Sequence, residues 1–391
     1  MRRLREHRNR DRDLGARVLR RTRRGTCSLL FVVALALGLL PSPVSADASD
    51  GSILFSRYDP DSNTFSLYAT RTDGSEERRL TDASLSAWDA TFSPDGSHLV
   101  FSGARQGDTA IYVMAADGTS LRKLTEGSVD LEPGWSPDGA RIVFVRRDSL
   151  IDEQSAVMTM LADGSEERAV TAATHSHTDP SWSPDGTSIL FTRLRSARRG
   201  WDVYVADAEG SSIRNLTARE GNDLAPEWSP TGDRIVYERH CACRRGADSS
   251  EIYAMSPDGS GKERMMFNRS GDHLPHWSPD GAWISFLRCS GTSCGIYVMK
   301  ATGRDKIELG SGDQGGTPYV WAPDSSALSY SQTSERGYTL FTIDLTGAKR
   351  RIGDATGVAV SDWTQTGTYS TGAPSSQLRR RTLDHSRPCR V

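Results

Sequence analysis

The chain repeats one five-residue motif, Trp135-Ser136-Pro137-Asp138-Gly139, which returns unchanged at Trp182 and Trp277. Variants of this motif begin at Phe92, Trp228, Trp321 and Trp363. Successive aromatic anchors are 43, 47, 46, 49, 44 and 42 residues apart. Seven copies at nearly one period predict a repeat architecture, in which each copy is one supersecondary unit.

A second motif accompanies each anchor: an apolar run such as Ile111-Tyr112-Val113-Met114, closed by Gly118. Similar runs begin at Leu67, Val157, Val203, Ile252, Ile296 and Leu340. The pattern predicts four short strands per unit. The first ends at the aromatic anchor, Pro-Asp-Gly turns the chain into the second, and Asp-Gly joins the third to a short fourth. Four antiparallel strands every ~45 residues are typical of a propeller blade.

The repeat begins and ends in the middle of a unit. Residues 52–81 supply the second to fourth strands of a blade, and residues 357–363 supply a lone first strand. Joining the two pieces would complete a blade and remove the exposed sheet edges. We therefore predict an all-β, seven-bladed β-propeller over residues 47–368, closed by the N-terminal strands plus the C-terminal strand.

The Trp-Ser-Pro-Asp-Gly turn, followed by Ile-Tyr-Val-Met and Asp-Gly, resembles the TolB-like β-propeller repeat over residues 51–367. The resemblance implies the fold and no single activity. Such propellers occur in envelope proteins that hold partner proteins, in the substrate-gating domains of peptidases and in polysaccharide lyases. Only the leader precedes the first strand, and no hydrolase domain accompanies the repeats, so we expect neither the α/β domain of TolB nor a peptidase.

The segments that flank the repeats have a different composition. Residues 1–46 combine an Arg-rich start, a short apolar run and a Val-Ser-Ala site, as in a signal peptide; an uncleaved anchor is the alternative. Residues 369–391 form an Arg-rich tail that we expect to be disordered. The leader indicates export to the periplasm, the cell envelope or the extracellular space.

Removal of the leader would leave an acidic protein. The 37 remaining Lys and Arg face 47 Asp and Glu. An acidic body argues against nucleic acid and anionic membrane surfaces as partners. It suits cations, basic peptides or neutral sugars, and we expect contact with a membrane only through the leader.

Acidic and imidazole side chains gather in the segments that lead into each innermost strand, which open at one mouth of a propeller channel. These segments hold Asp89, Asp130, Glu132, His175, His177, Asp179, Asp223, Asp272, His273 and His276. Three interpretations are open: carboxylates that cap strand ends, groups that bind a ligand or a divalent cation, and acid and base groups of an enzyme. The candidate metal ligands are His175, His177 and His273, whose loops are two blades apart.

Five cysteines follow the leader. Cys289 and Cys294 flank a four-residue hairpin loop, which predicts a disulfide in an exported chain. Cys241 and Cys243 occupy the equivalent loop one repeat earlier, and a zinc site built from these four is the alternative. The motif Gly291–Gly295 matches G-x-S-x-G, but it joins two strands of one hairpin and not a strand and a helix, so we assign no nucleophile there.

The sequence thus favours an exported, monomeric, non-catalytic propeller that binds a protein or peptide of the cell envelope, or a small ligand, at the channel mouth. The alternative function is that of a metal-assisted polysaccharide lyase or hydrolase, which would use a His/Asp cluster at the same mouth.

Overall fold

The computed structural model describes residues 51–127, 129–149, 154–196, 200–218, 221–240, 250–268, 270–291, 293–312, 319–334, 337–355 and 358–364. The expected signal peptide, the expected tail, Cys241, Cys243 and Cys389 lie outside these residues. All regular structure in the described part of the chain is β-strand, arranged in seven four-stranded antiparallel sheets. Within it, no helix is long and apolar enough to cross a membrane.

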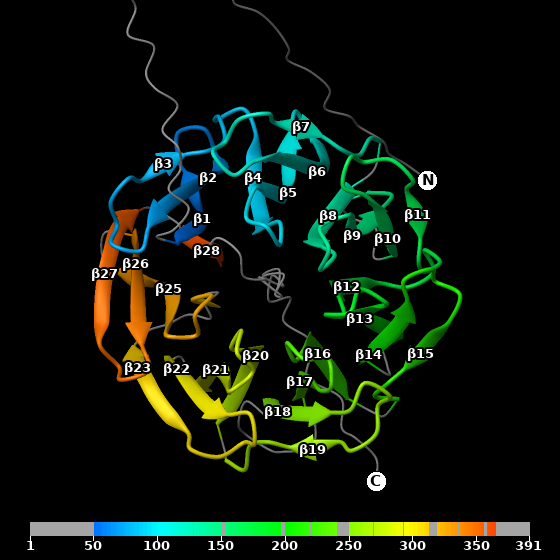
Figure 1. Cartoon of the computed structure of the whole chain (residues 1–391), viewed down its shortest axis with the longest axis vertical. Coiled ribbons are helices and arrows are strands. Elements are labelled where there is room, and N and C mark those ends of the chain that lie inside the picture. The colour runs from blue at the N-terminus through cyan, green and yellow to red at the C-terminus, as the bar shows by residue number, and fades with distance from the viewer. Residues whose placement is uncertain are drawn as a thin grey trace, which may run out of the picture. The chain divides into compact units, whose positions relative to one another are not determined.

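The sheets are the blades of a propeller and follow one another around a ring (Figure 1). From the innermost strand outward, the first blades hold β28 (Val358–Thr364), β1 (Ser52–Asp59), β2 (Thr64–Arg71) and β3 (Arg78–Arg79) in blade 1; β4 (Ser86–Phe92), β5 (His98–Arg105), β6 (Asp108–Ala115) and β7 (Arg122–Lys123) in blade 2; and β8 (Val129–Trp135), β9 (Arg141–Arg147), β10 (Ala156–Leu161) and β11 (Arg168–Ala169) in blade 3.

The remaining blades repeat this order. They hold β12 (His177–Trp182), β13 (Ser188–Ser196), β14 (Gly200–Asp207) and β15 (Ile213–Asn215) in blade 4; β16 (Asn222–Trp228), β17 (Ile235–His240), β18 (Ser250–Met255) and β19 (Glu263–Arg264) in blade 5; β20 (Gly271–Trp277), β21 (Trp283–Ser290), β22 (Ser293–Lys300) and β23 (Ile307–Gly312) in blade 6; and β24 (Tyr319–Trp321), β25 (Ala327–Ser334), β26 (Gly337–Asp344) and β27 (Lys349–Ala355) in blade 7.

Blade 1 closes the ring with strands from both ends of the repeat region. Strand β28 pairs antiparallel with β1, from Ser52 opposite Thr364 to Arg57 opposite Val358. The predicted seven blades, four strands per blade and closure are therefore confirmed. Strand β28 covers the inner edge of β1, which would otherwise be exposed, and takes the innermost place in the sheet.

The Pro-Asp-Gly turn explains why each first strand reverses into the second. In blade 3, Ser136 Oγ donates to Asp138 Oδ1 over 2.6 Å, and the backbone N–H of Ala140 donates to the same oxygen over 3.0 Å. Gly139 has a φ of 70°, a conformation that glycine adopts without steric penalty. The aromatic anchor beside the turn packs between blades, where Trp135 Nε1 donates to the carbonyl of Thr91 on blade 2.

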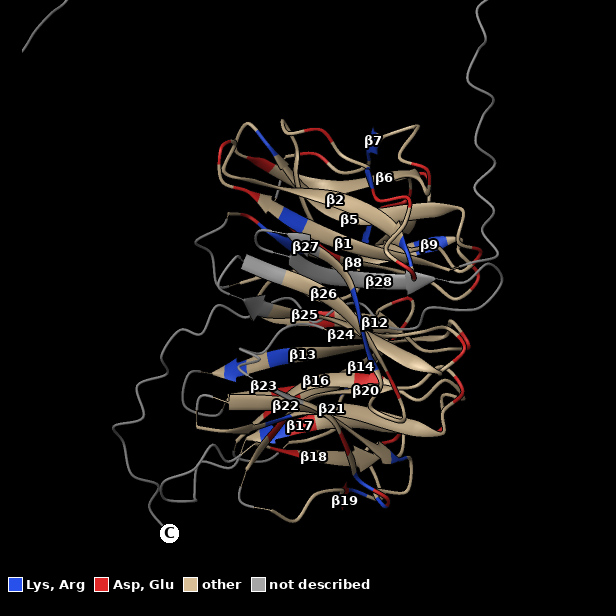
Figure 2. Cartoon of the chain, turned by 90° about the vertical axis from the view of Figure 1, so that its left-hand side faces the viewer, with Lys and Arg blue, Asp and Glu red and all other residues tan. Residues whose placement is uncertain are grey.

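Aromatic cross-strand pairs fill the middle of most blades. The second and third strands place Phe101 opposite Tyr112, Phe191 opposite Tyr204, Phe286 opposite Tyr297 and Tyr330 opposite Phe341, with ring centroids 5.7–5.8 Å apart. Side chains on these strands alternate between the two faces, so each blade buries apolar residues against both neighbours. Asp and Glu occupy many of the turns between strands (Figure 2).

Candidate functional site

Blades 2 to 6 each carry a β-bulge in the innermost strand. Its pairing register with the second strand shifts after Trp88, Leu131, Thr178, Leu224 and His273. The next residue has a positive φ in every case: 51° at Asp89, 57° at Glu132, 54° at Asp179, 47° at Ala225 and 50° at Leu274. A bulge takes one residue out of the ladder and re-aims its side chain. In blades 2, 3 and 4 that side chain is a carboxylate.

These three bulge carboxylates influence one another. Burial, and then the charge of Glu132, raise the pKa of Asp89 to about 8. Burial, and then Glu132, also raise the pKa of Asp179 well above its usual range, with a further contribution from Asp89. Blades 2 and 4 are not neighbours, so Asp89 and Asp179 can interact across the channel that the innermost strands line. Among the described residues, no Lys, Arg or His forms an ion pair with either.

Three other predicted site residues are instead engaged in ion pairs. Two nitrogens of Arg146 contact the two carboxylate oxygens of Asp130 at 2.8 and 2.9 Å. The equivalent pairs are Asp223 with Arg239 at 2.6 and 2.8 Å, and Asp272 with Arg288 at 2.7 and 3.5 Å. Each Asp is almost completely buried and lies opposite its Arg in the strand register. These pairs join the first and second strands of a blade, so the three carboxylates already have a partner.

His175, two residues before β12, and His177, the first residue of β12, lie in different surroundings. Arg193 donates to His175 Nδ1 over 2.8 Å. The positive charge of this guanidinium would repel a metal ion bound to the same ring. His177 is fully buried, with its Nδ1 2.7 Å from the carbonyl of Ser155. Burial lowers the pKa of His177 to about 4, so the ring is neutral at pH 7.

The third predicted imidazole, His273, lies in a different group. Its Nδ1 is 2.8 Å from Glu238 Oε1, and His240 Nε2 is 2.5 Å from the same oxygen. Burial alone would raise the pKa of Glu238, but hydrogen bonds from His240 and His273 outweigh it and hold that pKa well below its usual range. In the described part of the chain, this is the group of His, Cys, Asp and Glu whose ligand atoms all lie within 4.8 Å of one another, and neither His175 nor His177 belongs to it.

His276 forms a separate pair. Its Nδ1 is 3.0 Å from Glu227 Oε2, which also accepts from the backbone N–H of Trp277. Burial raises the pKa of Glu227 despite the neighbouring imidazole. The ring of Tyr319 packs edge-on against His276.

The positions of the site residues differ from expectation in one respect. We predicted that the acidic and imidazole residues occupy loops before the innermost strands, whereas nine of the ten lie inside β4, β8, β12, β16 and β20. Only His175 lies outside a named strand, and it forms an isolated bridge with Ser155. The bulges explain the difference, because the ladder continues on both sides of each one.

Three site residues escaped the sequence analysis: Glu238, His240 and Glu227. Glu238 and His240 lie in the second strand of blade 5, outside the segments before the anchors, whereas Glu227 immediately precedes the anchor Trp228, as His276 precedes Trp277. The available signal for Glu238 was a charged residue within the alternating strand Ile235–His240, followed two residues later by an imidazole. Cys289 and Cys294, which the sequence paired, are joined by a disulfide at the end of β21 and start of β22.

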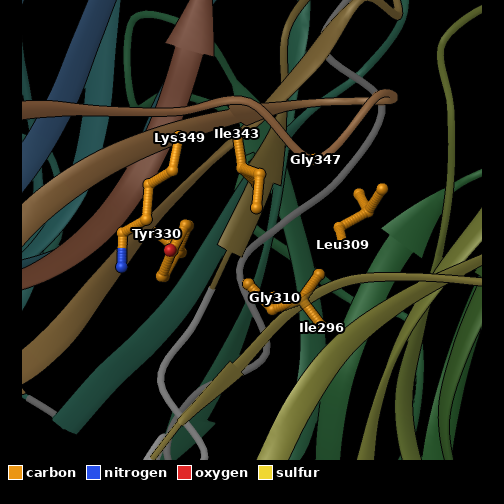
Figure 3. Close-up of a pocket in the computed structure, with 7 residues that line it drawn as sticks. All are labelled: Ile296, Leu309, Gly310, Tyr330, Ile343, Gly347 and Lys349. Atoms are coloured by element: carbon orange, nitrogen blue, oxygen red, sulfur yellow. The ribbon is translucent and has the colours of Figure 1, made fainter.

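A small pocket lies between blades 6 and 7, away from the innermost strands (Figure 3). Its volume is about 80 Å³, and its lining residues are Ile296, Leu309, Gly310, Tyr330, Ile343, Gly347 and Lys349. Sites for small molecules generally enclose some 300–1,000 Å³. This gap between blades therefore does not define the candidate site.

The protein is thus a closed propeller whose innermost strands carry a group of carboxylates around the central channel. The chain belongs to the TolB β-propeller domain family, whose sequence profile matches residues 45–201 and 194–366.

Individual relatives match a smaller part of the chain than the family profile does, or match it at low sequence identity. The uncharacterized peptidase YuxL of Bacillus subtilis is 39% identical over 79 residues, which are 20% of this chain and 12% of YuxL. TolB from Acinetobacter baumannii has a TM-score of 0.51 at 17% identity, covering 77% of this chain and 79% of that one. Oligogalacturonate lyase from Vibrio parahaemolyticus has a TM-score of 0.57 at 14% identity, covering 78% and 86%.

These similarities define the fold alone. The chain spans only 12% and 29% of the length of the curated relatives it matches.

Proposed function

We propose that this protein is an exported, non-catalytic binding protein that receives a positively charged segment of a protein or peptide partner in the mouth of its channel. The observation that carries the proposal is the set of bulge carboxylates at Asp89, Glu132 and Asp179. They come from three consecutive blades and share one structural position.

The contrast with the ion-paired carboxylates supports this assignment. Asp130, Asp223 and Asp272 each form an ion pair with an Arg on the neighbouring strand. In contrast, Asp89 and Asp179 form no ion pair with a described cationic residue. Both side chains are half-buried, and an ionised carboxylate that has lost part of its water and has no counter-charge is unfavourable. The ammonium of a Lys side chain, the guanidinium of an Arg or a free amino terminus would supply that charge.

An anionic ligand fits this channel less well. An acidic oligosaccharide would supply no counter-charge to Asp89 and Asp179 and would oppose their ionisation, because like charges in a low-dielectric site interact strongly. We therefore favour binding of a basic partner over a polysaccharide lyase, although the fold is shared with one.

The test is peptide binding to the exported protein, measured by fluorescence anisotropy with labelled Lys-rich and Glu-rich decapeptides. We expect the Lys-rich peptide to bind more tightly, and Asp89→Asn or Asp179→Asn to weaken it roughly tenfold, as for loss of a buried charge partner. Glu166→Gln removes one exposed charge from the turn after β10 and serves as the matched control. Equal binding of the two peptides, or equal loss in the control, would overturn the proposal.

The pH dependence offers a second test of the same site. A cation that binds beside Asp89 favours its ionised form, so binding releases a proton below the raised pKa of about 8. Affinity for the Lys-rich peptide should therefore increase between pH 6 and pH 9 in the wild type. In Asp89→Asn that increase should be smaller, and an unchanged increase would place the binding site elsewhere.

Export is a separate part of the proposal. The composition of residues 1–46, which is that of a signal peptide, supports export. The disulfide between Cys289 and Cys294 also supports it, because disulfides persist in oxidising compartments outside the cytoplasm. Intact mass spectrometry of the protein recovered from the cell envelope or medium should find a chain that begins at Asp47. Recovery of the full-length chain from the cytoplasm would contradict export.

A further inference from the structure

We propose that Glu238, His240 and His273 form a binding site for one divalent transition-metal ion at the channel mouth. The site is separate from the bulge carboxylates that carry the proposed function. It also differs from the set His175, His177 and His273, since two of its three residues come from blade 5.

The geometry brings three donor atoms to one point. His240 Nε2 and His273 Nδ1 approach the same carboxylate oxygen, Glu238 Oε1, at 2.5 and 2.8 Å. The two imidazole rings are 6.0 Å apart between centroids and inclined by 56°. The three donor atoms lie within 4.8 Å of one another although they come from two blades.

This donor set matches the preferences of a transition-metal ion. Two imidazole nitrogens and one carboxylate oxygen, with further positions left to water, are a recurrent ligand set for zinc and other first-row ions. Bonds of about 2.1 Å at tetrahedral angles separate ligand atoms by about 3.4 Å. Small side-chain rotations would bring the distances between the two imidazole nitrogens and Glu238 Oε1 to that value. The ion would then replace the protons of the hydrogen bonds between these atoms.

The carboxylate is held in position by groups outside the donor set. Ser250 Oγ donates to Glu238 Oε1 over 2.6 Å, and the backbone N–H of Leu274 donates to Glu238 Oε2 over 3.1 Å. Leu274 is the bulge residue of blade 6, so the bulge aims its N–H at the carboxylate. Such second contacts orient metal ligands and raise affinity.

The site is also open on one side. The Glu238 side chain is 6% exposed, whereas His273 is 19% and His240 is 36% exposed. His240 lies opposite Asn222, the first residue of β16, and therefore at the entrance of the innermost strand. An ion could enter there and keep water ligands, while the buried carboxylate anchors it from below.

The decisive experiment measures metal content in the whole exported protein purified with a tag that lacks histidine. After treatment with EDTA, the protein is dialysed against Zn²⁺ or Mn²⁺ and analysed by mass spectrometry for metal per chain. We expect one ion per chain in the wild type, and a loss of roughly tenfold or more in affinity for His240→Gln and His273→Gln. His276→Gln, which alters the separate pair with Glu227, is the matched control and should bind like the wild type.

Two further measurements test whether each variant is folded and whether the ion binds at this site. Near-ultraviolet circular dichroism should show that each variant retains the folded aromatic core. Co²⁺ should give visible absorption bands in the wild type and in His276→Gln, and these bands should disappear in His240→Gln. Less than stoichiometric uptake by the wild type, or uptake that survives both His substitutions, would overturn the metal site and leave the peptide-binding proposal untouched.

Discussion

Glu132 accepts a 2.8 Å hydrogen bond from the backbone N–H of Asp179 on the next blade. Similar bonds of 3.1 Å join Glu238 to the N–H of Leu274, and Ser102 to the N–H of Glu132. In each case a polar side chain takes up the N–H of a bulge residue on the following blade. Because buried N–H groups need partners, the bulges bind the blades together while they shape the channel.

We expect this contact to contribute to stability. Glu132→Ala leaves the N–H of Asp179 without its acceptor and should lower the free energy of unfolding by about 1–3 kcal/mol. Glu132→Gln keeps an acceptor and removes a charge beside two other carboxyl groups, so it should lower stability less. Denaturant unfolding followed by tryptophan fluorescence makes the comparison, and an equal loss in both variants would assign the effect to charge rather than to the hydrogen bond.

The raised pKa of Asp89 predicts a stability that depends on pH. The unfolded carboxyl ionises near its ordinary value of 3.8, whereas the folded one stays protonated up to about pH 8. Its contribution to folding therefore falls as pH rises from about 4 to about 8. Asp89→Asn, which is neutral throughout, should have a higher Tm than the wild type at pH 9 and a similar Tm at pH 4. A constant difference across this range would show that Asp89 titrates normally.

The bidentate pair between Asp223 and Arg239 should behave differently. Both side chains are largely buried, at 4% and 13% exposure. Asp223→Asn leaves a partly buried guanidinium without its carboxylate and should destabilise the fold by about 3 kcal/mol. The double variant Asp223→Asn, Arg239→Met should lose less than the sum of the two single changes, as measured in a double-mutant cycle. Strict additivity would mean that the pair contributes no coupling energy.

The buried imidazole of His177 predicts loss of stability in mild acid. Its folded pKa is about 4, below the ordinary value of 6.5, so the unfolded chain takes up a proton first as pH falls. The stabilisation is complete above pH 6.5 and decreases as pH falls towards 4. His177→Gln should lower the slope of unfolding free energy against pH in this window. His98→Asn, which removes an exposed imidazole, is the control. An equal change of slope in both variants would contradict the assignment to His177.

Ring closure gives a further expectation. A chain that ends before β28 would expose the inner edge of β1 from Ser52 to Arg57, which pairs with β28 in the intact protein. Exposed strand edges template pairing with other chains. The truncated protein should therefore melt at a lower temperature and associate with itself, as seen by analytical ultracentrifugation. A truncated monomer with the wild-type Tm would show that β28 is dispensable.

The channel chemistry could be predicted only in outline. The sequence directed attention to the right blades, since Asp89, Glu132, Asp179 and His273 all line up before an anchor. It could not distinguish Asp130 from Glu132, two residues apart, because one is opposite Arg146 and the other occupies the bulge. Spacing along the chain does not separate them either, since an Arg follows sixteen residues after Asp89 and Asp179 as well as after Asp130.

The sequence by itself determined the seven blades, their four strands and the closure by both ends. Those features depend on local signals, namely a turn that Pro, Asp and Gly can form and an alternation of apolar residues, repeated at one period. Only the tertiary structure decided which polar groups meet. Glu238 and His273 are far apart along the chain and come together because blades 5 and 6 pack side by side, and the bulges that aim their neighbours depend on a register between strands that no single segment encodes.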